Sequence, residues 1–142
     1  MKRRRSREYA LQILFQLELT GSELSDALFE AFWEGNEEEK SVKDFTYHLV
    51  KNTLAHINEI DETIKKTAEH WSVERMAVID RNILREAAYE LLYRADIPPS
   101  VIINEALEIA KKYSTKDSAP FINGILDRIA HSVSSSTEYK KD

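Results

Sequence analysis

The first residues of the chain combine positive charge with an aromatic ring, a combination that can bind nucleic acid. Five basic residues precede position 8, and they are Lys2, Arg3, Arg4, Arg5 and Arg7. The whole chain has 20 Lys and Arg against 25 Asp and Glu, a net charge of −5. Without those five, 15 basic residues face 25 acidic ones, so the rest of the chain has a net charge of −10. A basic end on an acidic body concentrates the attraction for polyanions at one place.

The helix predicted for residues 1–19 has apolar side chains on two faces. At about 100° per residue, one stripe is typical of a core-facing side: Ala10, Ile13, Leu14 and Leu17. A second set lies roughly opposite, on the side of Arg4: Leu11, Phe15 and Leu19. Single-stranded RNA is bound by rings that stack on bases and by guanidinium groups that neutralise phosphates. The alternative is that Phe15 packs against a second helical layer and the arginines only make a terminus soluble. The pattern favours neither.

The composition indicates a single all-α domain. At 142 residues the chain is long enough to bury about two-thirds of its surface. It has no cysteine, which excludes disulfides and thiolate chemistry and is compatible with a reducing cytoplasm. No apolar run approaches the roughly 18 residues of a membrane span, and the basic start lacks the apolar segment of a signal peptide. Three Gly and three Pro are too few to separate many strands.

Hydrophobic periodicity and cap residues predict about seven helices. Their expected ranges are 1–19, 23–34, 40–54, 57–70, 74–94, 100–113 and 118–132, with a polar tail at 133–142. Gly21 is predicted to end the first helix in the left-handed conformation, and Ser22 to cap the second. Gly124 lies inside the last helix, where glycine costs about 1 kcal/mol relative to alanine, and we interpret it as a point of close approach by another helix backbone.

The sequence contains no catalytic motif. A glycine-rich phosphate loop, a G-x-S-x-G elbow and an H-E-x-x-H pair are all missing. His48, His56 and His70 lack metal-ligand spacing. Asn104 and Glu105 at the start of the sixth helix are better explained by a structural role, such as pairing with an arginine of the fifth helix, than by catalysis. We therefore expect a binding module that needs no metal or cofactor, not an enzyme.

Several segments resemble the NusB family of bacterial transcription antitermination factors. The resemblance covers most of the chain, in order and at matching separations. It rests on the segments 3–15, 78–85, 88–92, 97–106, 110–112, 117–118 and 121–127. The final block, which ends in FINGILD, is highly specific, whereas the arginine run alone would be weak.

The resemblance implies a fold and a function. The fold would be two packed helical sub-bundles, about 1–70 and about 71–132, followed by the polar tail 133–142. The function would be to bind the boxA segment of ribosomal-operon RNA together with NusE, a small-subunit ribosomal protein. The pair would join an antitermination complex on RNA polymerase in the cytoplasm.

The family pattern also implies site residues. The RNA contacts would be Arg3, Arg4, Arg5, Arg7 and Phe15, with Asp117 and Phe121 near the RNA at the loop before the last helix. Phe15 and Phe121 could stack on bases, and Gln12 and Asp117 are candidates for reading base edges. Asp80 and Arg85 of the fifth helix would lie on or near the surface that faces NusE.

Three positions depart from the family pattern, and three alternatives stay open. Ser114 stands where the family commonly has Gly, Pro120 where it has an aliphatic or cationic residue, and Phe15 where tyrosine is frequent. Ser114 and Pro120 leave the geometry of the 114–120 loop open. A NusB-like domain also precedes some ribosomal-RNA methyltransferases, but this chain ends at 142 without a methyl-donor domain. An unrelated adaptor that binds no RNA is the second alternative. Self-association as a homodimer through Leu11 and Leu19 is the third.

Overall fold

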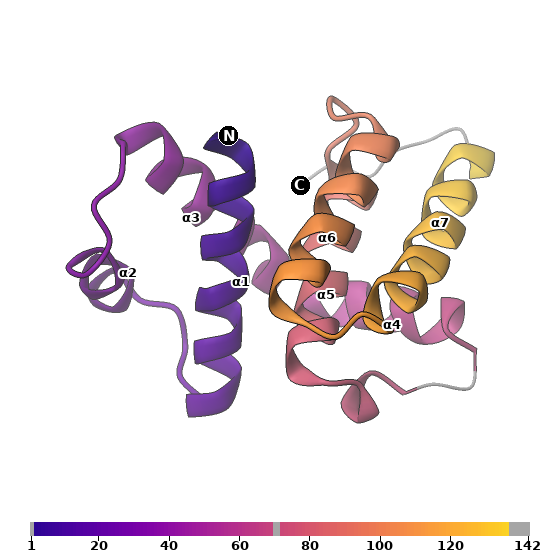
Figure 1. Cartoon of the computed structure of the whole chain (residues 1–142), viewed down its shortest axis with the longest axis horizontal. Coiled ribbons are helices and arrows are strands. Elements are labelled where there is room, and N and C mark those ends of the chain that lie inside the picture. The colour runs from indigo at the N-terminus through magenta and orange to yellow at the C-terminus, as the bar shows by residue number, and fades with distance from the viewer. Residues whose placement is uncertain (1, 70–71, 137–142) are drawn as a thin grey trace.

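The computed structural model describes residues 2–69 and 72–136, and over these residues the chain is all-α, as predicted (Figure 1). These described residues form seven α-helices and a short 3-10 turn at Val73–Arg75. The helices are α1 Lys2–Thr20, α2 Asp26–Trp33, α3 Lys40–Ala55, α4 Ile57–Thr67, α5 Val78–Tyr93, α6 Pro99–Tyr113 and α7 Ser118–Ser136. In the described part of the chain, no helix is both long enough and apolar enough to cross a membrane.

Helix α5 lies at the centre of the molecule. It packs against α1 and α3 on one side and against α4, α6 and α7 on the other. The buried apolar residues of these helices form one continuous core. Helix α4 packs on α5 and α7 more than on α3. A division by packing would therefore place α4 with the C-terminal helices, and the sub-bundle boundary near residue 70 stays a prediction.

The cap chemistry explains where α1 ends and α2 begins. Gly21 has a φ of +68°, the left-handed conformation predicted for the end of α1. Helix α2 is capped by Ser25, not by Ser22, because the Ser25 hydroxyl accepts a hydrogen bond of 3.1 Å from the Leu28 amide. The predicted start at residue 23 was therefore too early.

The predicted helix 74–94 is broken near its start. Val73–Arg75 forms the 3-10 turn, Met76 is extended with φ −73° and ψ 151°, and α5 begins only at Val78. Val73 and Met76 are both 4% exposed. The chain bends here, and both side chains reach the core. Helix α7 also continues to Ser136, four residues into the predicted tail; residues 137–142 lie outside the described residues.

The second apolar face predicted for α1 is not present as expected. Leu11 is 4% exposed and lies beside Ile83 of α5 and Ala106 of α6. Only Leu19, at 62% exposure, is an exposed large apolar side chain of that set. The prediction that Leu11 is on an open face was wrong, because α1 is covered on two sides. Self-association would have to rest on Leu19 without Leu11.

The prediction of a close approach at Gly124 was also wrong. A Cβ built on Gly124 meets nothing within 4 Å, and the residue is exposed in the middle of α7. We therefore expect Gly124→Ala to stabilise the protein by about 0.5–1 kcal/mol, because alanine has less backbone freedom to lose on folding. Urea unfolding monitored by circular dichroism measures this change. A lower midpoint for the variant would mean that the site does not tolerate a methyl group.

Candidate nucleic-acid interface

The arginines of α1 project from the helix in different directions and meet different partners. Arg3 is exposed, and its guanidinium carbon lies 3.7 Å from the ring centroid of Phe45 in α3. Among the described residues it forms no ion pair, so its hydrogen-bonding edges remain available. It borders a cavity of about 280 Å³ together with Lys2, Ser6, Ser41 and Phe45. A stacked arginine, a lysine and a serine hydroxyl around an open cavity are suited to binding a phosphate.

Arg4 points toward α6. Its Nε and Nη2 donate hydrogen bonds of 3.0 and 2.6 Å to the two carboxylate oxygens of Glu105. The Arg4 side chain is 34% exposed, whereas that of Glu105 is 9% exposed. This hydrogen-bonded pair raises the pKa of Arg4 and lowers the pKa of Glu105. The structural role expected for Glu105 was to satisfy backbone donors or to pair with an arginine of the fifth helix; its partner is instead Arg4 of the first helix.

Arg5 points toward the segment that leads into α3. Its Nε and Nη2 donate to Glu38 at 2.9 and 3.4 Å, and the Tyr9 hydroxyl donates to the same carboxylate at 3.1 Å. Arg5 is 41% exposed at its side chain and Glu38 is 10% exposed. The hydrogen bonds from Arg5 lower the pKa of Glu38. Arg4 and Arg5 are therefore surface cations, each paired through one edge with a mostly covered carboxylate.

Arg7 lies in the core. Its side chain is 4% exposed, and its Nε and Nη2 donate to Glu90 of α5 at 2.9 and 2.8 Å. The family resemblance implies that Arg7 contacts RNA. In the structure Arg7 instead forms a buried ion pair that links α1 to α5. The Glu90 side chain is completely buried, so this ion pair fixes the start of α1 against α5 without reaching solvent.

Glu86 completes this buried group. It hydrogen-bonds with Glu90, and its Oε2 atom is buried without a hydrogen-bond partner. Burial, reinforced by the neighbouring Glu90, raises the pKa of Glu86 well above its usual range. The folded protein thus keeps Glu86 protonated at pH values where the unfolded chain, with a glutamate pKa of about 4.3, is ionised.

We expect Glu86→Gln to stabilise the protein increasingly as the pH rises. The contribution of a glutamate with a raised pKa is fully present below its unfolded pKa and is lost as the pH rises through the folded pKa. Glutamine does not titrate, so the advantage of the variant should grow above about pH 4.3, by at most about 1.4 kcal/mol per pH unit. Urea unfolding of both proteins at several pH values between 4 and 8 measures this difference. Parallel pH profiles would contradict the assignment of a protonated Glu86.

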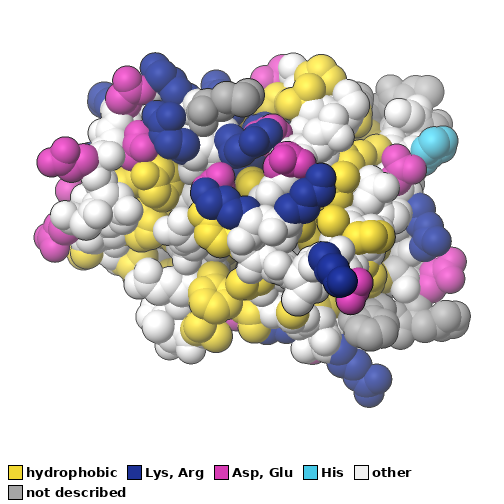
Figure 2. Space-filling view, in the orientation of Figure 1, with side chains coloured by type: hydrophobic (Ala, Val, Ile, Leu, Met, Phe, Trp, Pro, Cys, Tyr) yellow, Lys and Arg dark blue, Asp and Glu magenta, His cyan; other side chains and the backbone are white. Residues whose placement is uncertain are grey.

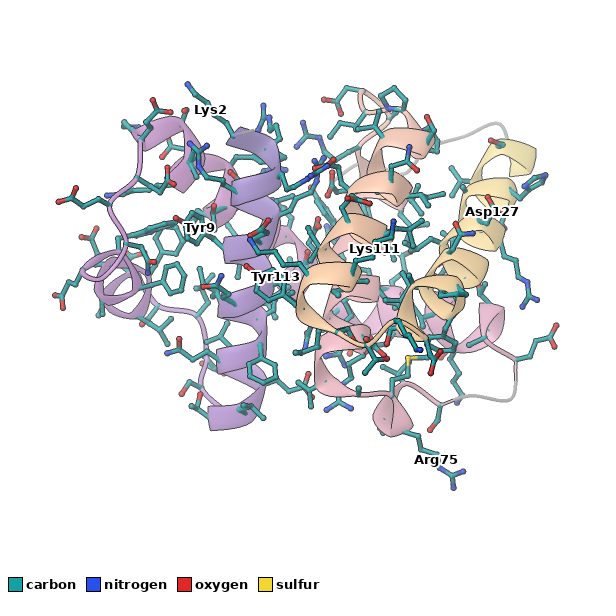
Figure 3. The ribbon with its side chains drawn as sticks, in the orientation of Figure 1. Lys2, Tyr9, Arg75, Lys111, Tyr113 and Asp127 are labelled. Carbon is teal, nitrogen blue, oxygen red and sulfur yellow. The ribbon has the colours of Figure 1, made fainter. Side chains whose placement is uncertain are left out.

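Below the arginines, α1 and α6 run side by side in the same direction (Figure 1). Glu8 of α1 accepts hydrogen bonds from the Lys112 Nζ atom at 2.9 Å and from the Tyr113 hydroxyl at 2.8 Å. Tyr113 lies between the two helices, and Lys111 projects from the same face (Figure 3). Burial and the bond to Glu8 raise the pKa of Tyr113, which also interacts with Gln12. Gln12 therefore lies beside Tyr113.

The surface formed by α1 and the α6 residues Lys111, Lys112 and Tyr113 adjoins the basic end of the molecule. Figure 2 shows Lys and Arg side chains, interspersed with carboxylates, over the start of α1 and along α6. Lys2, Lys111, Lys112 and Tyr113 are absent from the residues predicted for the site. The adjacent lysines 111 and 112 are visible in the sequence, but their place beside α1 follows only from the packing of α6. Phe15, one turn beyond Gln12, is half-buried, so its ring is not sealed in the core.

Asp117 and Phe121 lie at the opposite end of α6 from the arginines (Figure 1). Asp117 is exposed, Phe121 is half-buried, and both line a pocket of about 330 Å³ together with Met76, Ala77, Asp80 and Ser118. The structure therefore joins Arg4 to α6 but leaves Asp117 and Phe121 as a second cluster.

Hydrogen bonds to Asp80 fix the loop that carries Asp117. The hydroxyls of Ser114 and Ser118 donate to the two carboxylate oxygens of Asp80 at 2.6 and 2.9 Å. Ser114 thus holds the loop against the start of α5. Asp80 is 9% exposed, so its role in the structure is to anchor this loop.

Arg85 belongs to a network between α1, α4 and α5. It donates to both oxygens of Asp61 at 2.8 and 2.9 Å and to Glu18 at 2.8 Å. Arg81 also pairs with Glu18. The Arg85 side chain is 16% exposed, so its planar face is mostly covered. Partner binding by Asp80 and Arg85 stays a prediction. No group of three or more potential metal ligands occurs among the residues that the structure describes.

Comparison with known proteins decides the family. The model of the NusB family matches residues 4–131. The chain belongs to the NusB family. It is 52% identical to the transcription antitermination protein NusB of Thermodesulfovibrio yellowstonii, over 92% of each chain. It is 49% identical to the NusB of Desulfitobacterium hafniense, over all of this chain and 97% of the relative. NusB family members are antitermination factors without enzymatic activity, in agreement with the binding module expected from the sequence.

Solved NusB structures share the fold. The chain is 41% identical to NusB from T. maritima, with a TM-score of 0.81 over 91% of this chain and 90% of that one. A second similar structure is described as the antitermination factors NusB and NusE in complex with double-stranded RNA. It is 29% identical, with a TM-score of 0.82 over 92% of this chain and 97% of that one. The seven-helix arrangement is thus that of the NusB family.

Proposed function

We propose that this protein binds boxA RNA of ribosomal RNA operons together with NusE and joins an antitermination complex on RNA polymerase in the cytoplasm. One observation carries the proposal: Lys2, Arg3, Arg4 and Arg5 reach the surface at one end of a chain whose remainder is acidic. Family membership supports the antitermination role, and the similar structure of NusB with NusE and RNA supports both partners.

The proposed RNA path begins at Arg3, where a phosphate fits the cavity beside Phe45 and Ser41. It continues past Arg4 and the α6 lysines to Gln12 and Phe15. Asp117 and Phe121 form its far end, where an exposed carboxylate adjoins a pocket and a half-buried ring. Arg7 has no place on this path, because its guanidinium is buried against Glu90.

The division of tasks follows from the chemistry of each group. Arginine contacts to phosphates supply a salt-dependent term that does not depend on sequence. Stacking on Phe15 or Phe121 could add about 1–3 kcal/mol per base. Gln12 and Asp117 are the proposed readers of base edges, since each offers polar atoms at a surface. The acidic body repels RNA elsewhere and favours a basic partner such as a ribosomal protein.

Fluorescence titration of labelled boxA RNA, and of a scrambled RNA of equal length, tests the proposal in the presence and absence of NusE. We expect boxA to bind more tightly than the scrambled sequence and NusE to increase its affinity. Absence of RNA binding even with NusE would favour the protein–protein adaptor. Sedimentation of the free protein decides whether it self-associates.

A further inference from the structure

The carboxylate of Glu105 in α6 occupies one hydrogen-bonding edge of the Arg4 guanidinium. It accepts two hydrogen bonds from Arg4, at 3.0 and 2.6 Å, through the same planar fork with which an arginine binds a phosphate. The Arg4 side chain remains 34% exposed, whereas Glu105 is 9% exposed. Arg4 can therefore turn outward into solvent, but Glu105 cannot follow it.

Glu105 has a second cation to return to. The Arg7 Nη1 atom lies 3.7 Å from Glu105 Oε1. Release of Arg4 therefore does not leave Glu105 as an isolated buried charge, the situation that makes breaking a buried pair most costly. The geometry allows Arg4 to exchange one anion for another while Arg7 stays in place with Glu90.

We infer that Glu105 competes with RNA phosphate for Arg4 and so limits the affinity of the protein for RNA. The inference rests on the proposed RNA-binding function and adds to it a residue that opposes binding. Glu38 stands in the same relation to Arg5, which it holds through the same Nε and Nη2 atoms. Because Arg4 and Arg5 are already paired with carboxylates, phosphate contacts alone bind RNA weakly at the basic end. Tight RNA binding therefore also needs base contacts and a partner protein.

The test compares Glu105→Gln with the wild type, using a labelled boxA RNA and a scrambled RNA in about 0.1 M salt. We expect the variant to bind both RNAs more tightly, by about 1.4- to fivefold, the range that corresponds to the strength of a surface ion pair. Its salt dependence should be steeper, by up to about 0.7 in the logarithmic slope, because one more cation is free to release a phosphate counterion.

Two controls separate competition for Arg4 from a general change of charge. Asp127→Asn also removes one negative charge, from an exposed position on α7 away from the basic end (Figure 3), and should change affinity far less. Adding Arg4→Ala to Glu105→Gln should abolish the gain, because the effect acts through Arg4. If Glu105→Gln fails to fold, Glu38→Gln with and without Arg5→Ala provides the same comparison.

The outcomes are distinct. If the wild type and all variants bind no RNA, the proposed function itself fails. If the wild type binds RNA but Glu105→Gln binds equally or more weakly, the inference is overturned and the proposed function survives. A gain that persists without Arg4 also overturns it, since the cause would then be net charge. A gain that depends on Arg4 supports it.

Discussion

Arg7→Ala is expected to destabilise the protein by about 3–5 kcal/mol, the cost of leaving a buried charge without its partner. Glu90 is fully buried and accepts two hydrogen bonds from Arg7. Glu86, which hydrogen-bonds with Glu90, is an acid and cannot replace the lost cation. The loss would be a large fraction of the free energy of unfolding of a small domain, typically 5–15 kcal/mol.

Urea unfolding measures the effect of Arg7→Ala, and Arg5→Ala is the matched control. Both variants remove one arginine from α1 and break a bidentate pair, but Arg5 is 41% exposed, so its removal opens Glu38 to water, whereas Glu90 is completely buried. The control should lose much less stability, because water solvates the carboxylate that remains. Equal losses from the two variants would show that burial of the Arg7–Glu90 pair is not what matters.

The double variant Arg3→Ala, Arg4→Ala is expected to weaken RNA binding about 20-fold in 0.1 M salt. Each phosphate contact with a single strand contributes about 0.7 to the logarithmic salt slope, which amounts to about fivefold at this salt concentration. Losing two contacts should therefore also flatten the slope by about 1.4. Stability should change little, since Arg3 is exposed and the Arg4 pair is partly exposed.

Titration over a range of salt concentrations measures both quantities. Lys65→Ala, Lys66→Ala is the control, because it removes the same charge from exposed positions in the last turn of α4. It should leave the slope nearly unchanged. A double arginine variant with an unchanged slope would refute the placement of RNA at the start of α1.

The helices were predictable because their signals are local. Apolar residues at helical spacing, Gly21 and the paired prolines at 98–99 gave seven helices whose ends mostly lie within a few residues of those observed. The break before α5 was missed because Met76 continues the helical spacing of Ile79 and Ile83, although its backbone is extended. Leu11 was misplaced because no pattern within α1 reveals that α5 and α6 both cover it.

The candidate site was predictable as a list of residue types but not as a set of contacts. Arg4 and Arg7 are alike in the sequence and lie one turn apart, yet one is a surface cation and the other a core ion pair. What distinguishes them is the position of Glu105 and Glu90, about 100 and 83 residues away in the chain. The role of Ser114 was likewise not predictable, because its hydrogen-bond partner Asp80 lies on another helix.

The ring of Phe45 under Arg3 should affect how readily Arg3 binds a phosphate. A solvated arginine samples many rotamers and loses that freedom when it grips an anion, a loss of about 0.5–1.5 kcal/mol. Arg3, held flat against an aromatic face 3.7 Å away, has given up part of that freedom before any strand arrives. We therefore expect Arg3 to lose less side-chain freedom than a fully solvated arginine would when it binds a phosphate at the proposed site.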